Sequence, residues 1–315
     1  MGERNFPLRR YIRRVAEDAA FLSPAARLRF GKVRCFCACS SEMYTIFDSH
    51  THVFPEKICR RALQVMVEKS HGLETFTDGS VAGHEAEALR AGYSGWLNCP
   101  VVTSEKQMKS VNDWVATWNR WPSLSLGGLY PNAPMDVVLA EAKRIKKLGL
   151  LGVKFHPEYQ QFNPVDERLE PLWDLLAELR LPVLFHAGSD IGFLEQGRHS
   201  CPADFARLAE RHPALTIICA HLGGWRNWDE VENDLCGARV YLDTSFSKGW
   251  MTDQEQFERI IRKHGVERVL FGTDSPWTGM AEGIREVEET ALSAEEKQAI
   301  FYDNAARLFP LPKLK

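Results

Sequence analysis

Four histidines and one aspartate stand where runs of apolar, β-branched residues end, and this placement most constrains the fold. The residues are His50, His52, His186, His221 and Asp274. After each run the chain soon reaches Gly or Pro, as expected where a buried strand leads into a loop. Several strand ends can meet at one point when the strands are parallel and curl around a common axis. The sequence therefore predicts an α/β chain folded as a (β/α)8 TIM barrel, with a metal site at the C-terminal face of the strands.

Eight apolar runs recur at the spacing of a strand, a loop and a crossover helix. After a first gap of about fifty residues, they follow one another at about thirty residues, the length of one βαβ unit. Their centres lie near Ile46, Leu97, Ser125, Val153, Leu184, Ile218, Tyr241 and Leu270. Runs 182–185 and 216–220 are apolar throughout, which is typical of a parallel sheet buried on both faces. The first gap contains helical stretches near 56–70 and 82–92, which we expect to form a small lid.

Size and charge exclude several classes of protein. The 315 residues are enough for one barrel of about 250 residues with an added segment. A net charge of −3 creates no overall field that would attract nucleic acid or an anionic membrane. No apolar stretch reaches the roughly 20 residues of a membrane span. The eight cysteines are scattered as reduced thiols would be, so we expect a cytoplasmic protein.

The first 42 residues do not share the barrel pattern. They are rich in Arg and contain no run that resembles a strand of the sheet. We therefore expect two parts: a loosely ordered N-terminal extension, 1–42, and a metal-dependent barrel, 43–315. An organelle transit peptide is the alternative interpretation of 1–42, since such leaders are also rich in Arg and poor in acids.

The pair His50 and His52 carries the most chemical information. Residues i and i+2 of a strand point to the same side, so both imidazoles can face the barrel axis and bind one cation. His186 follows an apolar run and precedes Ala-Gly, and with the pair it is a third candidate ligand. Asp274 supplies a carboxylate that can bind the metal and accept a proton from its water. The alternative for Asp274 is a turn or helix cap, because Asp before Ser-Pro also suits a turn.

The chain resembles the amidohydrolase superfamily, and within it the branch that includes aminocarboxymuconate semialdehyde decarboxylase and related metal-dependent hydrolases. The likeness runs from about residue 44 to 309 and is carried by FDSHTHVFPEKI, LGVKFHPEYQ, LPVLFHAGSDIG, ICAHLGG, VYLDTSF, LFGTDSPW and NAARLF. The resemblance implies a distorted barrel with a divalent metal held by His50, His52, His186 and Asp274. It also implies that His221 acts as an acid or base that either binds the metal or lies close to it.

Both the number of metal ions and their identity can be considered from the candidate ligands. The resemblance implies a single ion, whereas a carbamylated Lys154 bridging two ions is the alternative. Ligands rich in histidine favour Zn²⁺, and Mn²⁺ remains open because ligand type alone does not exclude it. We therefore expect one divalent cation as the cofactor.

Three further residues are candidate substrate contacts. Lys154 and His156 are two positions apart, so both can face the same side of one strand, although Lys154 can instead point to the helix layer. Arg198 lies in a long loop after His186 that can cover the site. We assign no role to four other histidines, which follow helical stretches and are expected to face solvent or to be C-terminal helix residues: His71, His84, His212 and His264.

The expected chemistry is hydrolysis. A divalent cation lowers the pKa of bound water toward roughly 7 and supplies hydroxide at neutral pH. Asp274 is placed to take the proton of this water, and His221 can protonate a leaving group. We therefore expect an enzyme that hydrolyses an amide, lactone or ester of a small molecule, and the Ser-Pro-Trp sequence after Asp274 tilts us to this interpretation.

The same ligands support a second reaction, the non-oxidative decarboxylation of a small aromatic or unsaturated carboxylic acid. A decarboxylase of a di-acid would need cationic anchors, for which Lys154, Arg198, Arg226 and Arg60 are the candidates. In either case the partner is a small-molecule substrate, with no nucleic acid and no membrane. A homodimer is the base-rate expectation for a soluble enzyme.

Overall fold

The apolar runs form parallel strands. Seven of the eight predicted centres fall within strands, and the eighth, Ile46, directly precedes the first strand. The computed structural model describes residues 44–194 and 198–313, so the expected extension, 1–42, lies outside the described residues. The strands are β1 (Phe47–Thr51), β2 (Gly95–Asn98), β3 (Ser123–Ser125), β4 (Gly127–Gly128), β5 (Val153–Phe155), β6 (Val183–Phe185), β7 (Ile217–Cys219), β8 (Tyr241–Asp243) and β9 (Val269–Leu270).

Eight strand positions close into a barrel. The strands form two parallel sheets, with orders β1-β2-β3 and β4-β5-β6-β7-β8-β9. β3 and β4 are pieces of one position on either side of Leu126, with β3 paired to β2 and β4 paired to β5. The last position returns to the first: Ser49 N donates to Phe271 O at 2.8 Å. Asp274 N also donates to His50 O at 2.8 Å. The predicted distorted (β/α)8 barrel is confirmed.

The strands bury both of their faces. In β6, Leu184 packs inside the barrel, whereas Phe185 packs outward, with its ring centroid 5.4 Å from that of Phe205 in the helix layer. β7 repeats this alternation, with Ile218 inside and Ile217 outside. Successive side chains of a strand point to opposite faces, and here both faces meet apolar neighbours. This explains why the runs are apolar throughout rather than alternating.

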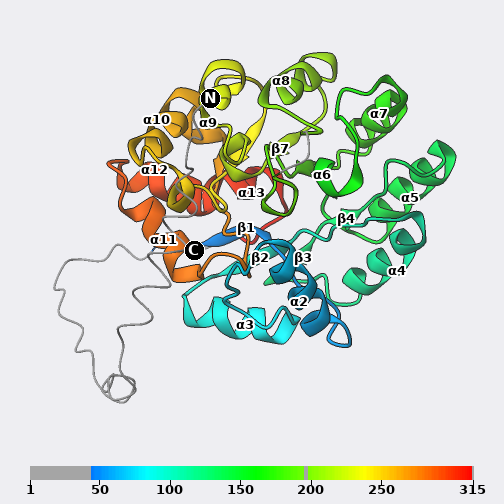
Figure 1. The fold of residues 1–315 in the computed structure, drawn as a ribbon, viewed down its shortest axis with the longest axis horizontal. Helices are drawn as coiled ribbons and strands as arrows, with labels where there is room; N and C mark the ends of the chain where they lie inside the picture. Colours follow the sequence, from blue (N-terminus) through cyan, green and yellow to red (C-terminus); the bar gives the residue numbers. More distant parts are fainter. Residues whose placement is uncertain (1–43, 195–197, 314–315) are drawn as a thin grey trace, which may run out of the picture. The chain divides into compact units, whose positions relative to one another are not determined.

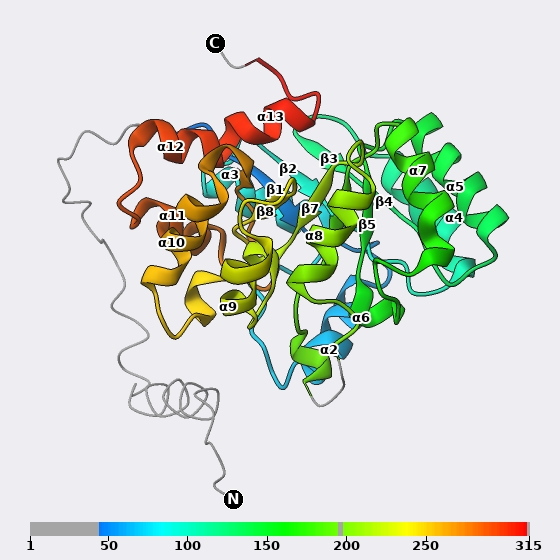
Figure 2. The same cartoon turned by 90° about the horizontal axis from the view of Figure 1, so that it is seen from above.

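Helices separate the strands and surround them (Figure 1), and Figure 2 shows the labelled strands between α4, α5 and α7 on one side and α10, α11 and α12 on the other. The helices are α2 (Cys59–Lys69), α3 (Val81–Arg90), α4 (Glu105–Ala116), α5 (Met135–Lys147), α6 (Pro157–Gln160), α7 (Glu170–Glu178), α8 (Pro202–Arg211), α9 (Trp228–Glu230), α10 (Glu255–His264), α11 (Met280–Glu288), α12 (Ala294–Gln298) and α13 (Asn304–Leu308). Tighter or wider helical turns are η2 (Glu167–Leu169), η3 (Ile191–Phe193), η4 (His221–Gly223), η5 (Val231–Leu235), η6 (Lys248–Trp250), η7 (Val266–Arg268) and η8 (Ala299–Asp303). Among the described residues, no helix is long and apolar enough to cross a membrane.

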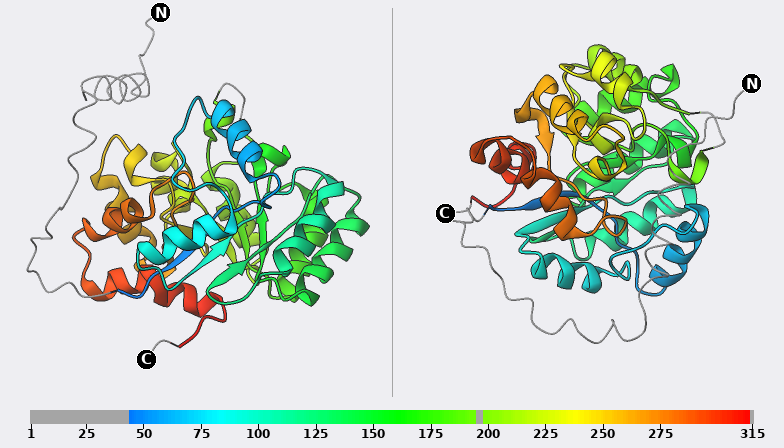
Figure 3. Two further views of the ribbon diagram at one scale, coloured as in Figure 1. Left: turned by 90° about the horizontal axis from the view of Figure 1, so that it is seen from below. Right: turned by 60° about the vertical axis from the view of Figure 1, so that its left-hand side comes forward.

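The two ends of the barrel are covered differently. At the end where the strands begin, Ala305 of α13 and the following Phe309 pack with the interior residues Phe47, Leu184 and Leu270. Helix α2 lies at the other end, and Figure 3 shows the blue α2 and the red α13 at opposite edges. Helices α2 and α3 form within the two stretches predicted as a lid. The end of the barrel where the strands begin is therefore closed by α13 and Phe309, and α2 lies over the opposite end.

Candidate metal centre

The C-terminal strand ends bring the predicted site residues together. His50 belongs to β1 and Lys154 to β5. His186 directly follows β6, and His221 begins the turn η4 after β7. Asp274 comes four residues after the end of β9. All five residues are buried, because they point into the barrel where its strands converge.

A cavity of about 510 Å³ lies over these strand ends. Its lining includes all but one of the predicted site residues, namely His50, His52, Lys154, His156, His186, His221 and Asp274. Most of the remaining lining is apolar or aromatic and comes from α2, α4 and the loops after the strands. A concave, largely apolar space with a few convergent polar groups is typical of a small-molecule site.

Asp274 joins the two histidines of β1. Its Oδ1 lies 3.0 Å from His52 Nε2 and 3.4 Å from His50 Nε2. The ligand atoms of these three residues all lie within 4.8 Å of one another, as a shared cation requires. Asp274 has a φ of 63°, a left-handed conformation that non-glycine residues seldom adopt outside special sites. The hydrogen bond from Asp274 N to His50 O holds this turn in place.

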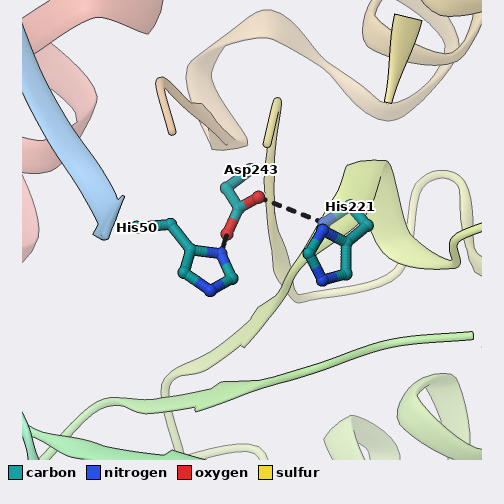
Figure 4. Close-up of side chains that lie close together, drawn as sticks. All are labelled: His50, His221 and Asp243. Carbon is teal, nitrogen blue, oxygen red and sulfur yellow. Dashed lines mark hydrogen bonds and ion pairs between the residues drawn. The ribbon is translucent and has the colours of Figure 1, made fainter. Parts of the chain in front are cut away.

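Asp243, at the end of β8, orients two histidines (Figure 4). Its Oδ2 lies 3.0 Å from His50 Nδ1, and its Oδ1 accepts a hydrogen bond from the backbone N–H of His221 at 3.1 Å. The hydroxyl of Ser245 also donates to Asp243 Oδ1, at 2.5 Å. A carboxylate that holds one ring nitrogen of a histidine leaves the other nitrogen available as a ligand. Asp243 thus fits the orienting role better than that of a ligand.

His186 and His221 form a second pair. His221 Nε2 lies 2.9 Å from His186 Nδ1. His186 Nε2 lies 3.1 Å from Ser189 O, and a carbonyl oxygen only accepts, so Nε2 carries the hydrogen. The lone pair of His186 is therefore on Nδ1, toward His221. His221 itself has a φ of 59°, which turns its ring into the site directly after β7.

The four predicted ligands do not form one tight group. Among the described residues, His186 lies within 4.8 Å of ligand atoms of His156 and Asp190, rather than with the group of His50, His52 and Asp274. His221 lies between the two groups, with ring centroids 5.3 Å from His50 and 4.7 Å from His186. The donors therefore surround one region, with His221 at its middle.

Lys154 faces this region and not the helix layer. Its Nζ lies 2.8 Å from His50 Nε2, and the side chain is buried. Burial lowers the pKa of the Lys154 ammonium, since removing a charge from water disfavours the charged form.

Burial also keeps the imidazoles neutral. It lowers the pKa of His50, His186 and His221 well below the usual range. Burial raises the pKa of Asp274, but the hydrogen bond with His52 and the charges of neighbouring side chains outweigh it and lower the pKa below its ordinary value. Neutral imidazole and ionised carboxylate are the forms that bind cations. The electrostatics of the site therefore suit a metal.

His156 stacks on His186, with ring centroids 4.0 Å apart and planes 8° apart. Its Nδ1 accepts a hydrogen bond from Tyr159 N at 3.3 Å, so Nε2 carries the hydrogen and faces Asp190 Oδ2 at 3.4 Å. Burial raises the pKa of the Asp190 carboxyl. Asp190 and Tyr159 were not identified from the sequence as cavity residues, although an Asp soon after the His186 strand end was a usable signal.

Other candidates lie elsewhere. Arg198 does not line the cavity, and its guanidinium pairs with Glu230 at 3.0 Å. His212 and His264 stand at the C-terminal ends of α8 and α10, as the expectation for them allows, and both are buried. His84 is buried within α3, which corrects the expectation for that residue. His84 lies on the inner face of α3 with its ring centroid 5.2 Å from that of Trp96, and the helical period that places it there was overlooked.

Comparisons with known proteins agree with this geometry. The profile of a family described as amidohydrolase matches residues 47–311. Among curated proteins, the chain is similar to gamma-resorcylate decarboxylase of Polaromonas sp. strain JS666, with 27% identity over 120 residues that cover 33% of this chain. The match covers only 37% of the length of that relative.

Solved structures share the fold. The 5-carboxyvanillate decarboxylase from Sphingomonas paucimobilis has a TM-score of 0.65 and 16% identity, covering 85% of this chain and 100% of that one. The 2,6-dihydroxybenzoate decarboxylase from Rhizobium has a TM-score of 0.65 and 16% identity, covering 85% and 99%. A dihydroxybenzoic acid decarboxylase from Polaromonas sp. JS666, with bound manganese and 2-nitroresorcinol, has a TM-score of 0.64 and 17% identity, covering 86% and 98%.

These findings correct the expected reaction. The curated relative and the three solved structures are all decarboxylases, so the expectation of amide, lactone or ester hydrolysis is wrong. The reaction named for these relatives corresponds to the alternative expectation, decarboxylation. The Ser-Pro-Trp sequence after Asp274 did not distinguish a hydrolase from a decarboxylase.

Proposed function

Because the chain belongs to the amidohydrolase family, we propose that it is a metal-dependent, non-oxidative decarboxylase of an aromatic carboxylic acid. The observation that carries the proposal is the convergence of neutral imidazoles and an ionised carboxylate at the base of a mainly apolar cavity. The decarboxylases similar to the chain support the reaction class, and their aromatic acids support the substrate class.

A divalent cation fits the donor set. We propose that His50, His52, His186 and Asp274 hold it, with Zn²⁺ and Mn²⁺ both compatible with nitrogen and carboxylate donors. The bound manganese of one structural neighbour supports Mn²⁺. When bound, such a cation attracts the oxygens of an acid and withdraws electron density from the carbon that loses CO2.

Decarboxylation requires that residues of the chain deliver one proton to the substrate. In decarboxylation the bond between the ring carbon and the carboxylate breaks, its electron pair stays on the carbon, and a proton replaces CO2. We assign the transfer of this proton to Asp274: the ionised carboxylate would take a proton from water and deliver it to the ring carbon as CO2 leaves, which returns Asp274 to its ionised form. His221 acts beside it as a hydrogen-bond partner for the reacting group, because its ring is oriented by Asp243 and Ser245.

The cavity walls suit an aromatic acid. Trp225, Phe246 and Trp277 contribute aromatic rings to the lining near the donors. Aromatic walls pack against a ring and exclude water, which strengthens the electrostatic interactions at the reacting carbon.

The reaction class is tested by loading purified protein with Mn²⁺ and incubating it with 2,6-dihydroxybenzoate and 5-carboxyvanillate without oxygen. We expect release of CO2 from 2,6-dihydroxybenzoate, with formation of the ring product that has lost its carboxylate, and no release by metal-free protein. Cleavage of ester or lactone probes by the Mn²⁺-loaded protein, with no CO2 from either acid, would contradict the proposal.

Location and assembly are separate proposals. The scattered cysteines support a cytoplasmic location, and base rates support a homodimer. Cell fractionation and sedimentation would test them.

A further inference from the structure

The cavity extends well beyond the metal donors, and its outer part has a different chemical character. Six hydrophobic side chains from α2, α4 and the adjoining loops line this part, and we call these six the apolar wing: Ile58, Met66, Leu73, Val101, Val111 and Trp114. The same elements and loops also contribute polar side chains to the lining, namely Ser70, Thr103, Gln107 and Ser110. The six wing side chains belong to the same continuous cavity as His50 and Asp274. A ligand at the donors therefore has direct access to the wing.

The wing leaves apolar surface in contact with solvent. Ile58 is 51% exposed, which is high for a large aliphatic side chain beside a cavity. Val111 and Trp114 are half-buried on the face of α4 toward the cavity. When a ligand covers contiguous apolar surface in a concave site, removal of that surface from water favours binding. The favourable free energy of binding grows with the apolar area that is buried.

Charge in the lining argues against a second anionic group. Among the described residues the lining contains one lysine and no arginine, and Lys154 lies at the floor, 2.8 Å from His50 Nε2. Of the other candidate anchors, Arg198 pairs with Glu230, and the guanidinium of Arg226 lies over the Trp225 ring, outside the lining. Lys69 of α2 lies outside the lining, with its Nζ 5.9 Å from the ring centroid of the lining residue Tyr159. A second carboxylate placed among the six wing side chains would lose hydration and meet no cationic side chain among them.

We propose that the acid bound by this site carries one carboxylate, held at the metal donors, and an apolar substituent of several carbons, held in the apolar wing. This inference rests on the proposed function for the position of the carboxylate. It adds a selectivity: monocarboxylic acids with an alkyl substituent are preferred to unsubstituted acids and to dicarboxylic acids.

Three probes that differ at a single ring position test the selectivity by calorimetry on the full-length, Mn²⁺-loaded protein: benzoate, 4-pentylbenzoate and benzene-1,4-dicarboxylate. We expect 4-pentylbenzoate to bind at least about tenfold more tightly than benzoate, because several methylene groups leave water. The dicarboxylate should bind more weakly than benzoate. Equal affinity for benzoate and 4-pentylbenzoate, or tightest binding of the dicarboxylate, would overturn the proposal.

A matched pair of variants locates the pentyl chain. Val111→Phe fills the wing and should reduce the affinity ratio of 4-pentylbenzoate to benzoate toward one. Val65→Phe adds the same bulk on the exposed side of α2, outside the lining, and should leave the ratio unchanged. An unchanged ratio in well-folded Val111→Phe would place the chain elsewhere and refute the inference.

Binding and turnover distinguish this inference from the proposed function. Calorimetry needs no reaction, so a preference for 4-pentylbenzoate without CO2 release from any acid would support the wing and reject the decarboxylase. CO2 release from 2,6-dihydroxybenzoate with no preference for the alkyl probe would do the reverse.

Discussion

Asp243 Oδ2 lies 3.0 Å from His50 Nδ1, and both side chains are fully buried, one at the end of β8 and the other in β1. An ionised carboxylate only accepts hydrogen bonds, so this contact places the imidazole hydrogen on Nδ1 and leaves the lone pair of Nε2 available to bind a cation. The contact thus determines which nitrogen of His50 meets a cation.

The first prediction concerns this contact. In Asp243→Asn the amide can offer its NH2 group to Nδ1 and so favour the wrong tautomer of His50. We expect the affinity for Mn²⁺ to fall by about 10- to 100-fold, the usual effect of losing such a partner. A competition titration with a coloured chelator measures it. Asp234→Asn, on an exposed residue, is the control, and a twofold change or less in Asp243→Asn would argue against the orienting role.

The second prediction concerns Asp274. Asp274→Asn removes both the ionised ligand and the proton carrier while preserving size, so we expect decarboxylation to fall by about 10²- to 10⁴-fold. The rate of CO2 release measures the loss, and circular dichroism checks that the barrel persists. Asp303→Asn, on an exposed residue of η8, should retain full activity. Activity of Asp274→Asn within tenfold of the wild type would remove this residue from the mechanism.

The third prediction concerns metal content. Elemental analysis of purified protein should find about one equivalent of a divalent metal, which the double variant His50→Ala, His52→Ala loses. A chelator should abolish CO2 release, and Mn²⁺ or Zn²⁺ should restore it. Two equivalents in the wild type would instead support a carbamylated Lys154 that bridges two ions, given its position 2.8 Å from His50.

The fourth prediction concerns stability and pH. Burial lowers the pKa of His84 from 6.5 to about 3. The folded protein therefore excludes a proton that the unfolded chain binds, so this group's contribution is complete above pH 6.5 and is lost as the pH falls toward 3. Between pH 7 and pH 5, His84 should reduce the free energy of unfolding by about 2 kcal/mol.

Urea unfolding of wild type and His84→Leu at both pH values tests this. The variant should show a smaller loss between pH 7 and pH 5 than the wild type. His71→Asn serves as the control, because His71 is exposed and Asn tolerates its left-handed φ of 59°. Parallel losses in wild type and His84→Leu would show that His84 is not the group responsible.

The barrel could be predicted because its signals are local. Apolar runs such as 216–220 report strands buried on both faces, and a polar residue after each run marks the end where loops begin. The strand position of His50 and the turn that carries Asp274 follow from these local signals. Their closeness follows from the topology alone, since parallel strands of a barrel end at the same face.

What the sequence did not predict depends on the course of loops and on helix rotation. The pairing of Arg198 with Glu230 joins the loop after His186 to the end of α9, and no periodicity encodes the path of that loop. The stacking of His156 on His186 depends on side-chain rotation at two strand ends. His84 was misassigned because its place on α3 was not compared with the apolar face of that helix. The reaction was misassigned because both chemistries use the same donors.

The backbone hydrogen bonds between β1 and the chain after β9 place the metal donors where the first and last parts of the barrel meet. His50 and Asp274 are separated by almost the whole barrel sequence, so their contact has one of the largest loop-closure entropies in the fold. The cation site is complete only after the ring of strands has closed. A bound cation therefore favours the closed ring over every partly assembled state, and metal capture during folding would report that the last strand has docked.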